Sequence, residues 1–399
     1  MFGQTVLRGA ALAGLAFALA TSVASAQVVV SSGTRATKTL SHAQLREIIK
    51  IAKPMEKVHR PSGVNGPSRI PVAGAPLPAP ATVAGDRGPA DGAGRMDDGG
   101  GSGVGRQGGQ APQNYGSGNL NTIFHYNDYL IPRILLKTFP YRATGFFLFQ
   151  QNGGWFICSA ALISNSILLT AGHCVHSGNN SASGWNTDGY YYPGSENENG
   201  GGTPYEPYGW AQASSFATWT CWFANGDLDQ GCDVGVVVLK KANGTTKEMG
   251  KLTGWYGFCV LNCRQNFWFF TQLGYPGNYY GANQMTTSQH LATPSTNNPL
   301  GGGTGLDYIW GSGMRGGSSG GPHVSNIGDI SDSASDPGQW TFRNIIFHTT
   351  SWGYISEAWK IQGGSPLSQA GGTNGFKPLY NLACNGARAL HGRRSCTPL

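Results

Sequence analysis

Residues 316–322 read Gly-Gly-Ser-Ser-Gly-Gly-Pro, in which glycines enclose a pair of serines. Glycines let a chain turn tightly around a serine. A serine hydroxyl is a weak nucleophile that needs a base, and the oxyanion formed by its attack on a carbonyl needs pre-placed N–H donors. We interpret Ser319 as a nucleophile and the backbone N–H groups of Gly317 and Ser319 as those donors. A flexible loop is the alternative in a chain with 62 glycines.

A candidate base and a candidate acid lie upstream, each beside an apolar run. His173 follows the run 167–169 through a turn of small residues, and Asp233 directly precedes the β-branched run 234–239. An aspartate beside a histidine fixes the histidine tautomer and stabilises the imidazolium. Taken singly, these residues also fit a core histidine, a strand-end cap and a turn serine. Their joint occurrence in the order His, Asp, Ser favours a catalytic triad.

These motifs resemble those of the chymotrypsin/trypsin-like serine peptidases. The resemblance rests on Cys-Ser-Ala-Ala-Leu-Ile at 158–163, on Thr-Ala-Gly-His-Cys at 170–174, on Asp233 and on the glycine–serine turn. It covers roughly residues 140–353. It implies an all-β fold of two six-stranded antiparallel barrels, with the active site in the cleft between them. It also implies hydrolysis of peptide bonds through an acyl-enzyme intermediate.

Two further stretches are similar to the bacterial glutamyl-endopeptidase-like branch of that family. They are Leu-Gly-Tyr-Pro-Gly at 273–277 and Met-Arg-Gly-Gly-Ser-Ser-Gly-Gly-Pro at 314–322. The branch carries a histidine close to the Trp-Gly of its substrate strand, whereas His348 here lies four residues before Trp352. A preference for acidic side chains is therefore not predicted.

The resemblance also suggests which residues contact substrate. Ser351, Trp352 and Gly353 resemble the strand that binds the substrate backbone and lines the primary pocket. Met314 and Arg315 precede the glycine–serine turn and are candidates for the pocket floor or wall. Trypsin-like enzymes usually have an aspartate before the nucleophile, which pairs with a new N-terminal ammonium after activation. This chain has Ser318 there, so that route of activation is not expected.

The distribution of short apolar runs independently favours an all-β sandwich or barrel. The runs 141–149 and 155–159 flank Gly153 and Gly154 as in a hairpin, and long helical patterns are absent. Further runs occur at 166–169, 234–239, 267–273 and 340–350. Residues 177–210, which include three consecutive tyrosines, are interpreted as a polar surface insertion, with a loop that contacts substrate as the alternative.

The first part of the chain differs in composition from the rest. Residues 1–26 resemble a signal peptide, with a basic start, an apolar centre and an Ala-Ser-Ala cleavage pattern. Residues 27–119 are rich in proline and glycine and are interpreted as a pro-segment, with a disordered linker as the alternative. Within them, 41–50 has a helix N-cap and an apolar face. Residues 120–399 are assigned to the peptidase domain.

Charge and hydropathy limit the partners. Residues 1–119 contain 12 basic and 6 acidic side chains, whereas the remainder contains 15 and 14. The peptidase part thus lacks the basic surface that nucleic-acid binding needs. After the signal peptide no apolar stretch is long enough to cross a membrane. We expect a secreted monomer, extracellular or periplasmic, that acts on polypeptides.

Eight cysteines in an exported chain imply disulfides. Proximity suggests Cys158–Cys174, Cys221–Cys232, Cys259–Cys263 and Cys384–Cys396, and the family resemblance independently implies the first of these pairs. A zinc site at 259–263 is the rival interpretation, but no paired ligand set accompanies it. Glu196, Glu198 and Glu206 match no calcium loop. Neither a metal nor another cofactor is predicted.

Two other functions remain open from the sequence. A secreted binding module on the same fold could retain the triad without using it, because a fold does not fix a function. An esterase would use the same chemistry, although the substrate-strand pattern favours peptides.

Overall fold

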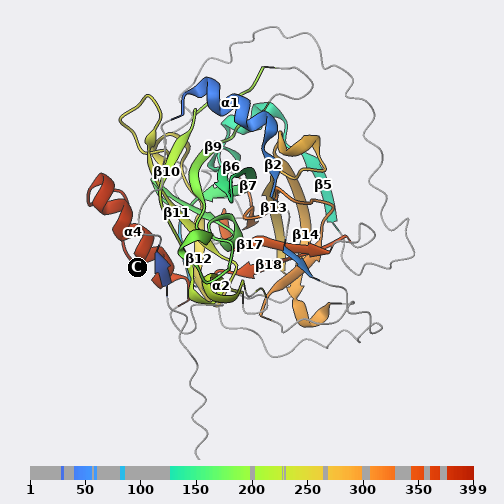
Figure 1. Ribbon diagram of the computed structural model, residues 1–399. Helices are drawn as coiled ribbons and strands as arrows, with labels where there is room; N and C mark the ends of the chain where they lie inside the picture. The colour runs from blue at the N-terminus through green and yellow to red at the C-terminus, as the bar shows by residue number, and fades with distance from the viewer. Residues whose placement is uncertain are drawn as a thin grey trace, which may run out of the picture.

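The computed structural model describes most of the peptidase part, residues 120–399, and short pieces of residues 1–119, which we call the leader. The described residues are 28–30, 40–55, 58–60, 81–85, 126–197, 203–226, 228, 231–263, 268–298, 306–328, 343–354, 360–368 and 375–399. The expected signal peptide at 1–26 lies outside them, as does most of the expected pro-segment. Figure 1 shows the strands of two barrels side by side.

Six antiparallel strands close into a first barrel. Around the ring they pair in the order β6–β7–β8–β11–β10–β9, and β9 pairs back with β6. The strands are β6 (Thr144–Gln151), β7 (Gly154–Leu162), β8 (Ile167–Thr170), β9 (Thr187–Pro193), β10 (Ala211–Trp219) and β11 (Gly235–Ala242).

A second barrel closes in the same way. Its strands pair in the order β16–β13–β14–β15–β18–β17, and β17 pairs back with β16. The strands are β13 (Trp268–Gly274), β14 (Thr286–Pro294), β15 (Tyr308–Gly311), β16 (Pro322–Ser325), β17 (Ile345–Tyr354) and β18 (Ile361–Pro366). The expected double barrel of six-stranded antiparallel sheets is confirmed.

The hairpin between β6 and β7 forms where the sequence predicts it, with its turn one residue earlier. Asn152 and Gly153 both have positive φ, at 49° and 81°. Two such residues match the twist of a two-residue hairpin, which explains the preference for Asn-Gly. The first part of the expected strand, Tyr141–Ala143, is instead a short 3-10 turn.

The expected surface insertion at 177–210 was wrong in one respect. Its middle forms β9, and Tyr190, Tyr191 and Tyr192 are at most 1% exposed. The Tyr191 hydroxyl donates to the Ala143 carbonyl at 2.9 Å, so its polar end is satisfied inside the barrel. A tyrosine run among asparagines and glycines resembles a polar loop in composition, but aromatic residues favour strands.

The expected leader helix is confirmed as α1 (His42–Ile51). Its N-cap Ser41 forms a capping box with Gln44. Four short leader strands pair with the peptidase part: β1 (Val28–Val30) with β10, β2 (Lys53–Pro54) with β7, β3 (Val58–Arg60) with β17, and β4 (Ala81–Val83) with β12 (Gly257–Leu261). A further strand, β5 (Tyr126–Leu130), pairs with β14.

The C-terminal helix α4 (Lys377–His391) was not predicted, since long helical patterns were judged absent. Its buried face consists of Leu379, Tyr380, Ala383, Cys384 and Ala387, which recur at helical spacing. Proline in its first turn fits a helix start. The helix follows the second barrel in the chain but packs on β10 and β11 of the first (Figure 1).

The structure has the four disulfides suggested by proximity, and none of the cysteines is free. The pair Cys259–Cys263 is one of them, so the rival zinc interpretation is not supported. Among the helices described, none combines the length and apolar character needed to cross a membrane.

Candidate active site

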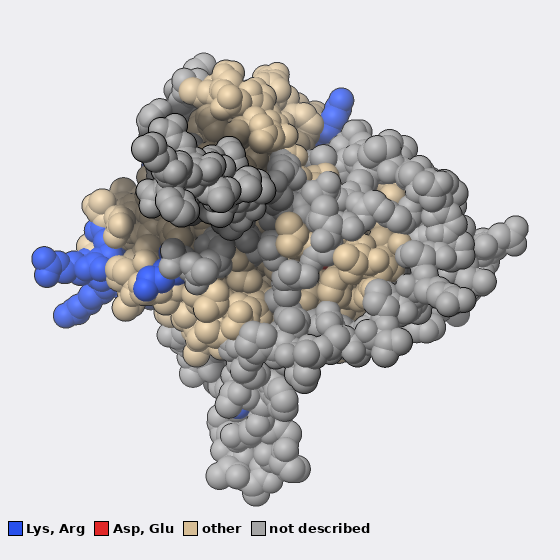
Figure 2. Space-filling view, turned by 90° about the horizontal axis from the view of Figure 1, so that it is seen from below, with Lys and Arg blue, Asp and Glu red and all other residues tan. Residues whose placement is uncertain are grey.

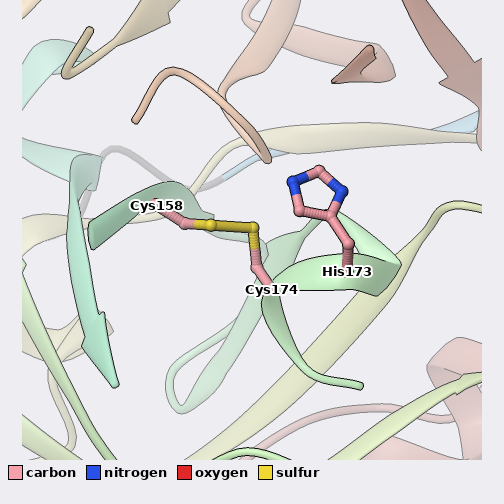
Figure 3. A group of neighbouring side chains, drawn as sticks. All are labelled: Cys158, His173 and Cys174. Carbon is pink, nitrogen blue, oxygen red and sulfur yellow. A yellow bond between two sulfur atoms is a disulfide. The ribbon is translucent and has the colours of Figure 1, made fainter. Parts of the chain in front are cut away.

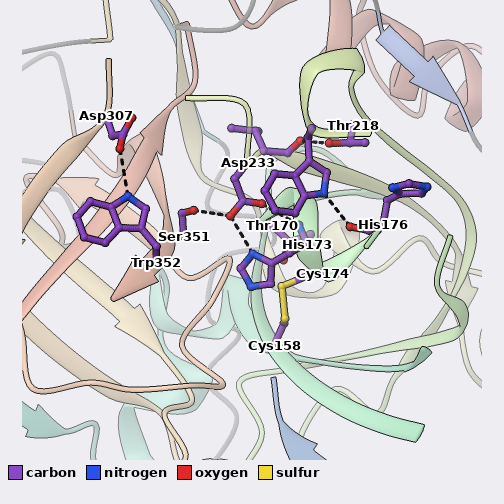
Figure 4. A network of polar contacts seen from close by, with 12 residues as sticks. Cys158, Thr170, His173, Cys174, His176, Thr218, Asp233, Asp307, Ser351 and Trp352 are labelled. Carbon is purple, nitrogen blue, oxygen red and sulfur yellow. Dashed lines mark hydrogen bonds and ion pairs between the residues drawn. A yellow bond between two sulfur atoms is a disulfide. The ribbon is translucent and has the colours of Figure 1, made fainter. Parts of the chain in front are cut away.

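The candidate base and acid are in direct contact at the edge of the first barrel (Figure 4). His173 lies in the 3-10 turn Gly172–Cys174 after β8, and Asp233 lies just before β11. The His173 Nδ1 is 2.8 Å from Asp233 Oδ2, and the His173 N–H donates to Asp233 Oδ1 at 2.7 Å. Both residues are buried, at 2% and 0% exposure. An ionised carboxylate only accepts, so Nδ1 donates in this contact, and in the neutral imidazole Nε2 is then the acceptor.

Asp233 is also held from the second barrel. The Ser351 hydroxyl on β17 donates to Asp233 Oδ2, the same oxygen that binds His173. Next to it, Trp352 Nε1 donates to Asp307 Oδ2 at 3.1 Å (Figure 4). In the predicted substrate strand, Ser351 therefore contacts the candidate acid Asp233, and Trp352 is held by the buried carboxylate of Asp307.

A short helix supports the histidine from its other side. The disulfide Cys221–Cys232 ties α2 (Thr220–Asn225) to the residue before Asp233. Trp222 on this helix lies 6.1 Å from His173 between ring centroids, and its Nε1 donates to the His176 carbonyl at 2.7 Å. Burial lowers the pKa of His176, so this second histidine is neutral at pH 7.

The glycine–serine turn is clamped between the barrels. Ser159 on β7 donates its N–H to the Ser319 carbonyl at 2.7 Å and its hydroxyl to the Gly317 carbonyl at 2.9 Å. Gly320, with φ of 77°, donates its N–H to the Thr350 carbonyl on β17 at 2.7 Å. A Cβ at Gly320 would lie 2.0 Å from Thr170 Oγ1, so only glycine fits.

The expected hydrogen bond between nucleophile and base is not formed. Ser319 Oγ and His173 Nε2 are both buried, and within the described part of the chain neither has a hydrogen-bond partner. Catalytic hydrogen bonds are often long or poorly aligned without substrate. The structure thus joins His173 to Asp233 and fixes the backbone of Ser319, but does not link the serine hydroxyl to the imidazole.

One candidate oxyanion donor is already engaged. Gly317, with φ of 92°, donates its N–H to the carbonyl of Met55 at 2.8 Å. Met55 belongs to the leader and was not predicted to lie at the site. No sequence signal identified it, because a backbone carbonyl is present at every position. The neighbouring Ser318 hydroxyl donates to the Arg315 carbonyl at 2.7 Å, within the same turn.

The other candidate substrate contacts lie around this turn. Met314 is buried, and its carbonyl accepts from Gln362 on β18. Arg315 is partly exposed, and its backbone N–H donates to Asn278 Oδ1 at 3.0 Å. Trp352 and Gly353 pair in parallel with the leader strand β3. The predicted pocket residues are thus near the turn, and two of them already pair with the leader.

A buried histidine cluster inside the second barrel was missed by the sequence analysis. His323 contacts His290 at 3.1 Å and Thr350 Oγ1 at 2.9 Å, and the His323 and His348 rings are 4.9 Å apart. Burial lowers the pKa of His290 to about 3 and that of His348 well below its ordinary value. The alternation of side chains along β14, β16 and β17 is the sequence signal that places these histidines on the inner face of the barrel.

Cys158, His173 and Cys174 are the described residues that come together with metal-binding atom types (Figure 3). Cys158 and Cys174 form a disulfide, and a disulfide sulfur is not the thiolate that metals require. The glutamates considered for calcium are paired elsewhere, Glu196 with Arg133 at 2.7 Å and Glu206 with His42 at 2.7 Å. Glu198 lies outside the described residues.

Comparison with known proteins gives a family match within the first barrel. Residues 138–200 match the family model described as Trypsin. The chain is 30% identical over 127 residues to the "Extracellular metalloprotease" of Bacillus subtilis (strain 168). That match takes in 31% of this chain and 35% of the relative, so the chain spans about a third of the length of the curated protein it matches.

Solved structures of proteases are also similar. The protease Anisep from Arthrobacter nicotinovorans is 24% identical, with a TM-score of 0.47 and coverage of 61% of this chain and 96% of that one. The thermostable serine protease AL20 from an extremophilic microorganism is 22% identical, with a TM-score of 0.45 and coverage of 62% and 98%. A Glu endopeptidase is 16% identical, with a TM-score of 0.42 and coverage of 66% and 96%.

Proposed function

We propose that this chain, whose residues 138–200 match the Trypsin family model, is a trypsin-like peptidase, namely a secreted serine endopeptidase that uses His173, Asp233 and Ser319. The observation that carries the proposal is the buried contact of His173 Nδ1 with Asp233 Oδ2 at 2.8 Å. The His173 Nε2 and the Ser319 hydroxyl are both buried, and neither has a hydrogen-bond partner among the described residues. Both features are what acyl transfer by a serine requires.

In the proposed reaction, Ser319 Oγ attacks a peptide carbonyl while His173 Nε2 takes its proton. The N–H groups of Gly317 and Ser319 stabilise the oxyanion, and His173 then protonates the leaving amine. Water hydrolyses the acyl-enzyme by the same steps. Asp233 holds the imidazole, and Ser351 holds Asp233. The substrate backbone pairs as an added strand with Ser351, Trp352 and Gly353. The pocket for the substrate side chain is bordered by Met314 and Arg315.

The location and the partners follow from the same proposal. Four disulfides fit an oxidising compartment, so we propose export by the signal peptide at 1–26 and removal of a pro-segment from 27–119. The partner is a polypeptide, and the enzyme acts as a monomer. In the face drawn in Figure 2, described Lys and Arg side chains project mainly on the α4 side, and a further one projects at the upper right. The near balance of 15 basic and 14 acidic side chains in residues 120–399 argues against nucleic acid as a partner.

The test compares the parent with Ser319→Ala and, as a matched control, with Ser183→Ala, whose serine is exposed. Each exported, processed protein is incubated with a diverse peptide mixture, and the products are sequenced by mass spectrometry. We expect cleavage by the parent and the control and none by Ser319→Ala. Absence of cleavage by the processed parent with its disulfides intact would favour a binding module instead.

A further inference from the structure

A leader segment runs across the candidate active site from one barrel to the other. It begins with β2, whose Lys53 and Pro54 pair in parallel with Phe156 and Ile157 of β7. Met55 continues the pairing, since its N–H donates to the Ile157 carbonyl at 2.8 Å. Three residues further on, β3 pairs in parallel with Trp352–Tyr354 of β17. We call the described residues 53–55 and 58–60 together the crossing segment.

The crossing segment uses groups that the proposed reaction needs. The Gly317 N–H has a single hydrogen, and it points to the Met55 carbonyl at 2.8 Å. It therefore cannot stabilise an oxyanion while Met55 is in place. Removing one such donor from a serine peptidase of another fold lowers kcat by about 10²–10³. The edge of β17 at Trp352 and Gly353, expected to receive substrate, is likewise paired with β3.

Helix α1 anchors the crossing segment. Leu45 is fully buried and Ile49 is 8% exposed, and both belong to the main hydrophobic core. At the start of the helix, His42 contacts Glu206 at 2.7 Å. At the other end, the ring of Pro54 lies over Gly277, where a Cβ would come within 2.5 Å of Pro54 Cγ. By contrast, Ile51 on the same helix is 71% exposed.

We propose that the crossing segment is a built-in blocker of the active site. The Met55 carbonyl occupies the Gly317 oxyanion donor, β3 occupies the substrate edge of β17, and α1 holds both in place. The proposal rests on the serine-peptidase function proposed above. It differs from activation through a new N-terminal ammonium, because the residue before the nucleophile is Ser318, whose hydroxyl is bonded within its own turn.

The test uses the full, unprocessed chain and three substitutions. Leu45→Asp places a carboxylate at a fully buried anchor position, and Ile51→Asp makes the same chemical change at an exposed position of the same helix. Gly277→Ala acts from the peptidase side, where its methyl group meets Pro54 at 2.5 Å and the rest of the domain only at 3.3 Å, at the Gly316 carbonyl. Gly277→Ala therefore releases the crossing segment by a second route, and it tests the proposal even if Leu45→Asp does not fold.

Two readouts separate occupancy from activity. Hydrogen exchange of the Gly317 N–H, measured in a Ser319→Ala background, reports occupancy without self-processing. The rate of labelling of Ser319 by diisopropyl fluorophosphate, measured with the serine intact and the chain length checked by mass, reports access and reactivity. We expect Leu45→Asp and Gly277→Ala to raise both rates more than tenfold, because a buried unpaired charge or a steric overlap costs more than a factor of ten in docking. Ile51→Asp should match the parent.

The proposal would be overturned by any of three results. Unchanged Gly317 exchange in both release variants would show that α1 and Pro54 do not hold a blocker, and would overturn the proposal. Faster exchange with an unchanged but measurable labelling rate would also overturn it, while leaving the peptidase function intact. Faster exchange with no labelling in any folded variant would remove the peptidase function, and the proposed blocker with it.

Discussion

At the scale of single residues, Asp233 is held by contacts from both barrels. It accepts the His173 N–H and contacts Nδ1 of the same residue, and it also accepts the Ser351 hydroxyl from the other barrel. These contacts hold the imidazole with its proton on Nδ1.

Asp233→Asn should therefore lower kcat by about 10⁴ while the fold persists, because the amide favours the wrong histidine tautomer. The measurement is hydrolysis of a cleavable peptide by the processed enzyme, alongside thermal unfolding. Activity within a few-fold of the parent, in a variant that melts normally, would remove Asp233 from the proposed triad.

Gly320 provides a second prediction at this scale. Alanine there should destabilise the protein by about 3–5 kcal/mol, because a left-handed conformation and an overlap with Thr170 act together. The matched control is Gly153→Ala, at φ of 81° with no atom within 4 Å, which should cost about 1–2 kcal/mol. Free energies of unfolding from urea titrations test this, and equal losses at the two positions would contradict it.

The candidate triad could be read from the sequence because each member lies in a short local pattern. His173 follows a small-residue turn after an apolar run, Asp233 precedes another run, and Ser319 lies among glycines. Met55 could not be found in this way, since it acts through its backbone carbonyl. The contacts of His290 depend on strand register, which local composition does not fix.

At the scale of elements, the sequence predicted the leader helix and missed the C-terminal one. Helix α1 has a strong cap at Ser41, and its apolar residues are spaced regularly. Helix α4 has no side-chain cap, and its buried face includes two alanines and a cysteine. These small residues give a weak hydrophobic signal, so the helical spacing of the apolar positions is hard to recognise in the sequence. Strand β9 was missed because its tyrosines lie among polar residues.

The turn that carries His173 is tethered to β7 by Cys158–Cys174. The double substitution Cys158→Ala with Cys174→Ala should lower stability by about 3 kcal/mol, by the loop-closure estimate. It should also lower kcat by about 10–100-fold, because small displacements of a catalytic group are costly. Unfolding and peptide hydrolysis measured together test this.

The matched control for this prediction is the pair Cys384–Cys396, which closes a loop of similar length far along the chain. Its double substitution to alanine should cost a similar free energy without a comparable loss of kcat per folded molecule. If both double variants lose activity equally, the tether on His173 has no special role.

At the scale of the whole molecule, the buried histidines make stability depend on pH. The pKa of His290 is about 3 in the folded protein against 6.5 ordinarily, and that of His348 is also strongly lowered. As pH falls below about 6.5 the unfolded chain binds protons that the folded one does not, so stability is lost on acidification. The loss approaches about 1.4 kcal/mol per pH unit for each such histidine.

Urea titrations between about pH 7.5 and pH 5 should therefore show a free energy of unfolding that decreases steadily. His290→Gln should reduce the slope, because it removes one of the groups that titrate only in the unfolded state. A free energy that is constant over this range would show that these histidines take up protons in the folded protein as readily as in the unfolded one.

The overall architecture was the most predictable level. Short apolar runs separated by glycine, proline and asparagine indicated an all-β fold, and the family resemblance selected the double barrel. The pairing of leader strands with both barrels was not predictable, because three-residue strands carry little hydrophobic pattern. The excess of basic residues in the leader revealed its separate composition, but not its pairing with both barrels.

Ser318 has a consequence for the proposed removal of the pro-segment. Its hydroxyl closes the nucleophile turn on the Arg315 carbonyl, so the turn does not need a chain end with one particular amino group to keep its shape. Selection then has little reason to preserve one cleavage position. Hosts whose proteolytic enzymes trim the leader raggedly should still obtain working molecules. For the same reason, an affinity tag at the front of the trimmed chain should be tolerated.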